Sequence, residues 1–168
     1  MGSALVHNDL FLSYYGDDFT GSADVMESLT FNGIPAALFL EPPTIEEVER
    51  FRLKLDFASV DGKIKAFGVA GVARSMSPGQ MDEELPPIFE QISKIPADFF
   101  QYKACSTFDS APHIGNIGHA AEIASRYFKT GFIPLVIGAP FLNRFVVFGN
   151  LFARVGEDTF RLDRHPTM

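Results

Sequence analysis

Two adjacent aspartates, Asp17 and Asp18, directly follow an apolar run that begins at Leu10. The residues after them favour a helix that ends near Gly33. A strand that ends at paired carboxylates and leads into a helix places negative charge at the carboxyl edge of a sheet, where open α/β sheets bind ligands. Because adjacent carboxylates repel each other, a cation, a metal ion or a substrate hydroxyl usually satisfies such a pair. The structural alternative is that one aspartate only caps the helix.

Further polar residues follow the later predicted strands. The cations at these positions are Arg74, Lys103 and Arg144. The loop after the fourth predicted strand adds side-chain oxygens from Ser106, Thr107 and Asp109. In a parallel sheet these strand ends share one edge, so the residues can converge in one crevice. Cations for a carboxylate and oxygens for hydroxyls suit a small polyhydroxylated acid.

Hydrophobic patterning predicts alternating strands and helices. The predicted strands cover residues 10–15, 34–40, 66–73, 99–104 and 132–137. The predicted helices cover residues 22–31, 44–55, 81–93 and 117–128. Capping-box sequences open the second helix at Thr44 and the third at Ser77. Pro86 and Pro87 lie inside the third helix, and we expect them to break or kink it.

This alternation is typical of an α/β fold with a mostly parallel sheet and helices on both faces, a Rossmann-like arrangement of three layers. Residues 145–155 and 159–163 flank Gly156-Glu157-Asp158, which predicts a C-terminal β-hairpin. We expect one domain over residues 10–168, because the chain has 168 residues and no visible linker.

Composition excludes several classes of function. The net charge is −7 and no basic stripe is visible, which argues against partners such as nucleic acid or an anionic membrane. No apolar run reaches membrane-spanning length, and residues 1–9 lack a signal pattern, so we expect a cytoplasmic protein. Cys105 is the only cysteine and is interpreted as a packed thiol. The histidines lack zinc-ligand spacing, so no metal site is predicted. A homo-oligomer is compatible with the sequence.

Several motifs resemble those of the four-carbon acid sugar kinases. They are Gly16-Asp17-Asp18-Phe19-Thr20-Gly21-Ser22-Ala23-Asp24, Tyr102-Lys103-Ala104-Cys105-Ser106-Thr107-Phe108-Asp109-Ser110, Gly115-Asn116-Ile117-Gly118, Phe148-Gly149-Asn150-Leu151-Phe152 and Leu162-Asp163-Arg164-His165-Pro166-Thr167-Met168. The second and third motifs are most similar to the 3-oxo-tetronate kinase branch. The resemblance extends from about Leu10 to the end of the chain and corresponds to the amino-terminal, acid-sugar-binding domain of that family.

The resemblance implies the substrate-binding half of a kinase that phosphorylates a four-carbon sugar acid, such as 3-oxo-tetronate, threonate or erythronate, with ATP and Mg²⁺. The family's carboxy-terminal nucleotide-binding domain is not part of this sequence, and no Walker-type phosphate loop occurs in it. We therefore expect the isolated chain to bind no nucleotide cofactor and to be inactive without that domain or a partner chain. The alternative is a stand-alone sugar-acid-binding module, or a truncated family member, without catalysis.

By the same resemblance, the substrate site contains Asp17, Asp18, Arg74, Lys103, Ser106 and Asp109, with Thr107 and Arg144 as further candidates. Asp17 or Asp18 would orient or deprotonate the reacting hydroxyl, and the sequence does not distinguish them. Lys103 would bind the carboxylate, or else form a structural ion pair with Asp17 or Asp109. The stereochemistry of the acid stays open.

Overall fold

The computed structural model describes residues 9–54 and 63–166. The chain forms two compact units. The first contains the described residues up to Cys105 together with Asp109–Lys129, and the second contains Ser106–Phe108 together with the residues from Thr130 onward. Each unit is described by itself below. That residues 10–168 act as a single sugar-binding domain stays a prediction.

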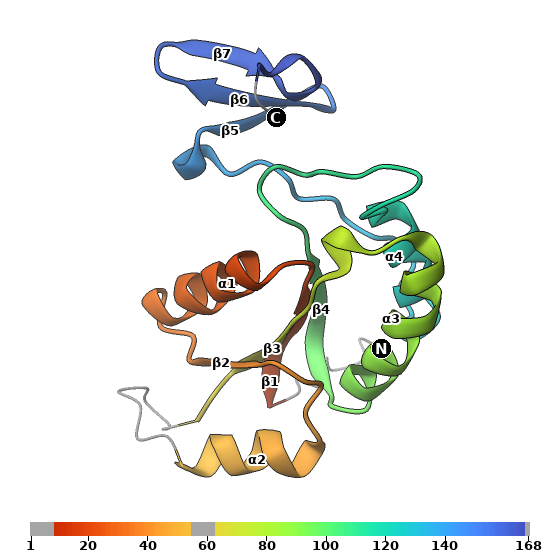
Figure 1. Ribbon diagram of the computed structural model, residues 1–168. Coiled ribbons are helices and arrows are strands. Elements are labelled where there is room, and N and C mark those ends of the chain that lie inside the picture. Colours follow the sequence, from red (N-terminus) through yellow and green to blue (C-terminus); the bar gives the residue numbers. More distant parts are fainter. Residues whose placement is uncertain (1–8, 55–62, 167–168) are drawn as a thin grey trace, which may run out of the picture. The chain divides into compact units, whose positions relative to one another are not determined.

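The first unit is built on a parallel sheet (Figure 1). Its strands are β1 (Leu10–Gly16), β2 (Ala36–Phe39), β3 (Ala66–Ala70) and β4 (Ala97–Lys103), in the order β2-β3-β1-β4. Its helices are α1 (Phe19–Phe31), α2 (Ile45–Lys54), α3 (Pro78–Ser93) and α4 (Ile117–Ala124). The carboxyl ends of three strands are level, because Gly16 is in register with Ala70 on one side and with Lys103 on the other.

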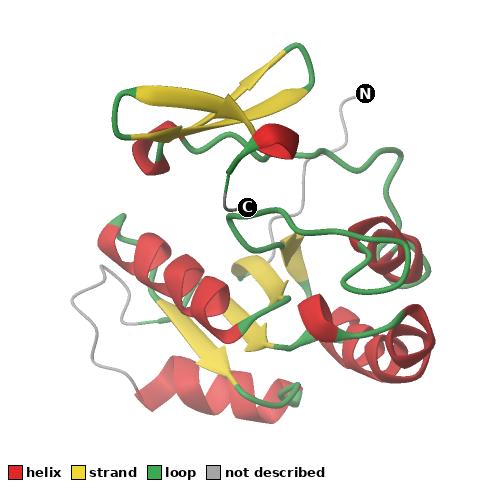
Figure 2. Ribbon diagram, turned by 45° about the horizontal axis from the view of Figure 1, so that its top comes forward, coloured by secondary structure: helices red, strands yellow, loops and turns green. Residues whose placement is uncertain are grey.

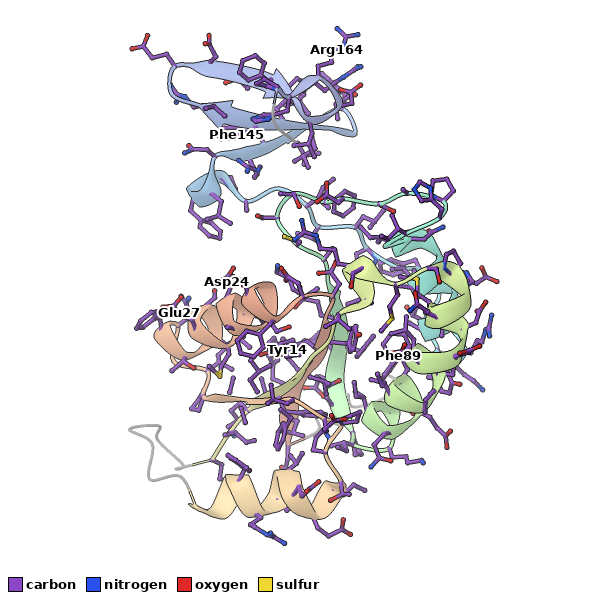
Figure 3. All side chains as sticks on the ribbon, in the orientation of Figure 1. Tyr14, Asp24, Glu27, Phe89, Phe145 and Arg164 are labelled. Atoms are coloured by element: carbon purple, nitrogen blue, oxygen red, sulfur yellow. The ribbon has the colours of Figure 1, made fainter. Side chains whose placement is uncertain are left out.

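Alternating side chains of β1 separate two hydrophobic cores. Tyr14 and Leu12 pack in a cluster with side chains of α1, such as Val25. Tyr15 points to the other face, where the cluster includes side chains of α2, α3 and α4, among them Phe89. This alternation is the period of two expected of a strand. Figure 2 shows the helices on both faces of the sheet. Figure 3 shows Tyr14 on the side of α1 and Phe89 on the side of α3.

Both predicted capping boxes are present. The Ser77 hydroxyl accepts a hydrogen bond from the Gln80 backbone N–H, and the Thr44 hydroxyl accepts one from Glu47. The expectation that Pro86 and Pro87 break α3 is wrong, since the helix is continuous from Pro78 to Ser93. Two prolines remove two backbone donors. The carbonyl groups that lose their partners belong to the exposed turn before them, where water can reach them.

The predicted fifth strand over residues 132–137 is also wrong. The structure forms no strand there, and Phe132, Leu135 and Val136 are exposed. Within the described residues, β4 pairs only with β1. A short apolar run can be a strand, a helix or an extended segment, and its pattern alone does not decide between them. The predicted helix over residues 117–128 also ends earlier, at Ala124, and residues 125–127 form turns.

The second unit contains a three-stranded antiparallel sheet. Its strands are β5 (Arg144–Val147), β6 (Asn150–Val155) and β7 (Asp158–Arg161), in that order. The predicted hairpin is β6 and β7, and Gly156 in its two-residue turn has φ +62°. The segment predicted as one arm is divided into β5 and β6, because Phe148 and Gly149 both have positive φ and form a second tight turn. The predicted fold class, a parallel α/β sheet followed by a hairpin, is confirmed.

Candidate functional site

At the carboxyl edge of the parallel sheet, neighbouring strands lead into helices on opposite faces. Strand β1 leads into α1 on one face of the sheet. Its neighbours β3 and β4 lead into α3 and α4, which pack on the other face. The loops after β1 and its neighbours therefore diverge at this edge. Such a switch point is where α/β sheets bind ligands.

Asp17 lies at this point and is buried. Its backbone is held from both sides, because its N–H donates to the Lys103 carbonyl (2.9 Å) and its own carbonyl accepts from the Arg74 N–H (3.1 Å). Its side chain is 2% exposed, and Oδ1 has no hydrogen-bond partner among the described residues. A buried carboxylate oxygen without a donor is a costly arrangement, which a ligand could relieve.

Burial raises the pKa of Asp17 to about 6. The backbone N–H of Cys105 favours the charged form and opposes this effect, the neighbouring Asp18 carboxylate adds to it, and the cations Lys103 and Arg74 lower the pKa again. A carboxyl group with a pKa near 6 is mostly ionised at neutral pH, yet it can accept a proton readily.

Asp18 has a different environment. It is the N-cap of α1, and its Oδ1 accepts a hydrogen bond from the Gly21 backbone N–H at 2.8 Å. Its Oδ2 lies 3.5 Å from Arg74 Nη1. Both oxygens thus already have partners within the protein. Asp18 therefore caps α1, as the structural alternative predicts for one of the two, and the two adjacent aspartates have different surroundings.

Arg74 lies in a short 3₁₀ turn, Ala73–Ser75, after β3. Its Nη1 donates to Cys105 Sγ (3.1 Å), and its Nη2 donates to Asp109 Oδ2 (2.8 Å). The nearby Cys105 sulfur raises the pKa of Arg74 most, and Asp109 and Asp18 raise it further, whereas burial lowers it. The guanidinium stays charged and draws the loop after β4 toward the loop after β1.

Lys103 is the last residue of β4 and is half-buried. Its Nζ donates to the Ala104 carbonyl at 2.8 Å. A Cβ atom built on Gly21 would lie 3.3 Å from Lys103 Nζ, so the ammonium group lies against the first turn of α1. In the part of the chain that is described, no carboxylate is close enough to form an ion pair with Lys103. The alternative of a structural ion pair with Asp17 or Asp109 is therefore not found.

The segment that carries Asp109 is fixed by the residues that follow it. The Gly115 N–H donates to the Met76 carbonyl at 2.9 Å, and a Cβ atom on Gly115 would lie 2.5 Å from the Arg74 carbonyl oxygen. Gly115 also has φ +56°, which glycine adopts at little cost. Asn116 caps α4, with its side chain accepting from the His119 N–H. The Gly-Asn-Ile-Gly motif therefore has a structural role beside Arg74.

The first unit brings together five of the predicted site residues: Asp17, Asp18, Arg74, Lys103 and Asp109. Ser106 and Thr107 belong to the second compact unit. Arg144 also belongs to it, at the start of β5, where its Nη1 donates to the Leu142 carbonyl at 3.3 Å. The substrate roles of all eight residues stay predictions.

Two residues that lie against Arg74 are not among the site residues predicted from the sequence. The sequence predicts a packed thiol at Cys105, but the side chain is half-buried and accepts a hydrogen bond from Arg74. Its place in the loop after β4, two residues from Lys103, was the available signal. Gly115 belongs to the Gly-Asn-Ile-Gly motif, but nothing in that part of the sequence indicates its close approach to the Arg74 carbonyl.

The cluster combines two cations with three carboxyl groups, which are the buried Asp17, the capping Asp18 and the Asp109 that pairs with Arg74. Such a site can bind an anion at Lys103 and Arg74 and can orient or deprotonate a hydroxyl at Asp17. Among the described residues, no three His, Cys, Asp or Glu side chains are grouped to hold a metal ion. None of the described helices is long and apolar enough to cross a bilayer.

Comparison with known proteins defines the class. Residues 12–168 match the family described as "Sugar-binding N-terminal domain". The chain therefore belongs to this family of sugar-binding N-terminal domains. The resemblance to the amino-terminal domain of the four-carbon acid sugar kinases is confirmed.

Curated relatives of the chain are kinases. A 3-oxo-isoapionate kinase of Paraburkholderia graminis is 46% identical over 159 residues, which are 95% of this chain and 32% of that protein. The 3-oxo-tetronate kinases of Brucella melitensis and Haemophilus influenzae are 28% and 26% identical, over 86% and 84% of this chain and 30% and 31% of their own lengths. The chain thus spans about a third of the length of the curated relatives it matches.

A solved structure shares the fold. The crystal structure of a protein from Salmonella typhimurium LT2 aligns with a TM-score of 0.69 and 24% sequence identity. The alignment covers 92% of this chain and 33% of the other. At this identity the likeness concerns the fold alone.

Proposed function

We propose that this chain is the substrate-binding domain of an ATP-dependent kinase that phosphorylates a small 3-oxo sugar acid. Membership of the sugar-binding family and the names of the relatives support this proposal. Those relatives are named for 3-oxo-isoapionate and 3-oxo-tetronate, which share a carboxylate and a keto group. The observation that carries the proposal is a buried, unpartnered Asp17 oxygen beside two cations at the sheet's switch point.

The substrate carboxylate is assigned to Lys103, with support from Arg74. The Lys103 ammonium group lies against the first turn of α1, close to the Asp18 carboxylate that caps the helix, but it forms no ion pair with a carboxylate of the described residues. Helix N-termini favour anions, because their backbone N–H groups lack partners within the helix. Arg74 already binds Asp109, so an acid at this site would share the guanidinium with Asp109 or displace it.

The reacting hydroxyl is assigned to Asp17 rather than to Asp18. Asp17 has an oxygen without a partner, whereas both oxygens of Asp18 contact the protein. A hydroxyl donating to Asp17 Oδ1 would satisfy the buried oxygen. As the hydroxyl oxygen attacks a phosphoryl group, Asp17 would accept its proton, which a carboxylate with a pKa near 6 can do.

The family resemblance implies ATP and Mg²⁺ for the longer protein. When bound, they would supply the transferred phosphoryl group and neutralise its charge. The described residues offer no cluster of metal-ligating side chains, so the proposal assigns Mg²⁺ no ligand in this chain. Its residues bind the acid and hold the hydroxyl.

Titration calorimetry tests the binding role. We expect 3-oxo-tetronate or 3-oxo-isoapionate to bind the chain, and the Lys103→Met variant to bind it about ten- to a hundredfold more weakly, because a charge-assisted contact contributes about 1.5–3 kcal/mol. A matching sugar without the carboxylate should bind both proteins equally poorly. Unchanged acid affinity in folded Lys103→Met protein would move the carboxylate site away from Lys103, with Arg144 as the next candidate.

A further inference from the structure

Cys105 is the only cysteine of the chain, and it lies in the loop after β4. Its side chain is half-buried, and its sulfur accepts a hydrogen bond from Arg74 Nη1 at 3.1 Å. Reactive cysteines lie in partly exposed surroundings beside cationic groups, as Cys105 does here. The side chain is therefore neither an inert core group nor part of the proposed acid-binding set.

A second observation indicates a ligand site close to this residue. The Asp17 carboxyl group is 2% exposed, and its Oδ1 has no partner among the described residues. The backbone N–H of Cys105 favours the charged form of that same carboxyl group by hydrogen bonding. Cys105 thus contacts Asp17 through its backbone and Arg74 through its sulfur. A chemical change at the sulfur occurs beside both groups.

We propose that Cys105 is an oxidation site, and that its conversion to a sulfenic acid by hydrogen peroxide prevents the sugar acid from binding. The inference rests on the proposed function, because it assigns a regulatory chemistry to the same site. The thiolate sulfur attacks one peroxide oxygen, so that an S–O bond forms and the O–O bond breaks. Hydroxide leaves and takes up a proton to become water. The sulfur loses two electrons, and the peroxide gains them.

The contact with Arg74 explains why binding would be lost. The added oxygen extends from a sulfur that already lies 3.1 Å from Nη1, so it enters the space beside the guanidinium. A sulfenic oxygen is also a better hydrogen-bond acceptor than a sulfur atom. It would compete with the substrate carboxylate for Arg74 and would occupy volume close to Asp17. Reduction by a dithiol forms a mixed disulfide with release of water, and then restores the thiol.

The single cysteine allows a direct experiment on the whole chain. The protein is treated with hydrogen peroxide, desalted, and checked by intact-mass spectrometry and by a sulfenic-acid-specific probe. Calorimetry with 3-oxo-tetronate then follows the untreated, oxidised and dithiothreitol-reduced samples. Cys105→Ser protein is treated in parallel, because peroxide also oxidises methionine. A second measurement compares the rate of Cys105 oxidation with and without a saturating concentration of the acid.

We expect oxidation to weaken acid binding at least tenfold, dithiothreitol to restore it, and the Cys105→Ser protein to bind the same before and after peroxide. Bound acid should slow oxidation of Cys105. Equal affinity of the oxidised and untreated proteins would overturn this inference and leave the proposed function intact. Failure of peroxide to oxidise Cys105 would overturn it as well. If neither 3-oxo acid binds the untreated protein, the proposed function fails, and this inference fails with it.

Discussion

The Asp17→Asn substitution should make the stability of the protein less dependent on pH. The pKa of Asp17 is raised from 3.8 to about 6 in the folded protein, chiefly by burial. The folded state therefore holds this proton more tightly than the unfolded state. The resulting stabilisation is complete below pH 3.8 and is lost as the pH rises through 6. Above that pH the wild type contains a buried charge, whereas the isosteric Asn variant does not.

The magnitude follows from the two pKa values. They differ by about two, and each pKa unit corresponds to about 1.4 kcal/mol, so ionisation of Asp17 costs about 3 kcal/mol of folding free energy at pH 8. At pH 4 the cost is about 0.5 kcal/mol by the same relation. Relative to wild type, the Asn variant should thus gain about 2.5 kcal/mol between pH 4 and pH 8. Any constant cost of burying the amide cancels in this comparison.

Urea unfolding at several pH values measures the effect. The free energy of unfolding is determined for wild type and Asp17→Asn between pH 4 and pH 8, and the difference is plotted against pH. Asp24→Asn, which removes an exposed charge from α1, controls for the change in net charge. If the difference in free energy of unfolding between the variant and wild type stays constant, or becomes less favourable to the variant as the pH rises, ionisation of Asp17 does not destabilise the fold and the argument is refuted. If the proposed function holds, a protein that joins this domain to a nucleotide-binding domain should lose phosphorylation with Asp17→Asn while keeping its fold, because active-site residues often lower stability.

Three other predictions address the surroundings of Asp17. Asp18→Ala should lower the free energy of unfolding by about 0.5–2 kcal/mol, because the cap of α1 is lost. Asp18→Asn should retain most of the wild-type stability, and equal losses in the two variants by urea unfolding would argue against a cap. Gly115→Ala should cost at least about 1–2 kcal/mol by the same assay, since its φ is positive and its Cβ would strike the Arg74 carbonyl; wild-type stability would contradict that packing. The chain with 3-oxo-tetronate should release no ADP from ATP, and turnover near the usual kinase rates of about 1–100 per second would show that it holds a nucleotide site.

Local chemistry made much of the fold predictable from sequence. Ser77 and Gln80 form a capping box within four residues, so the start of α3 needs no knowledge of the tertiary structure. The carboxyl edge was predictable for a similar reason. Asp17 follows β1 directly, and Lys103 ends β4, so a parallel sheet alone brings them to the same edge.

Other features depend on contacts between distant residues. Asp17 and Asp18 are chemically identical in the sequence, and only the geometry of α1 gives the cap to Asp18 and the buried position to Asp17. The contact of Arg74 with Cys105 joins residues that are 31 positions apart, and it depends on the path of a loop held by Gly115. The segment 132–137 has the composition of a buried strand, but no pattern in it specifies a partner strand.

The location of the acid site is the central claim, and NMR spectroscopy of the ¹⁵N-labelled chain tests it most directly. 3-oxo-tetronate is titrated into the protein, and the changes in backbone amide shifts are mapped onto the sequence. We expect the largest changes in the loop and first turn at Asp17–Gly21, at Arg74 and at Lys103–Cys105, with small changes in β5, β6 and β7. Saturable shifts concentrated elsewhere, with these amides unaffected, would contradict a sugar-acid site at the carboxyl edge of the parallel sheet.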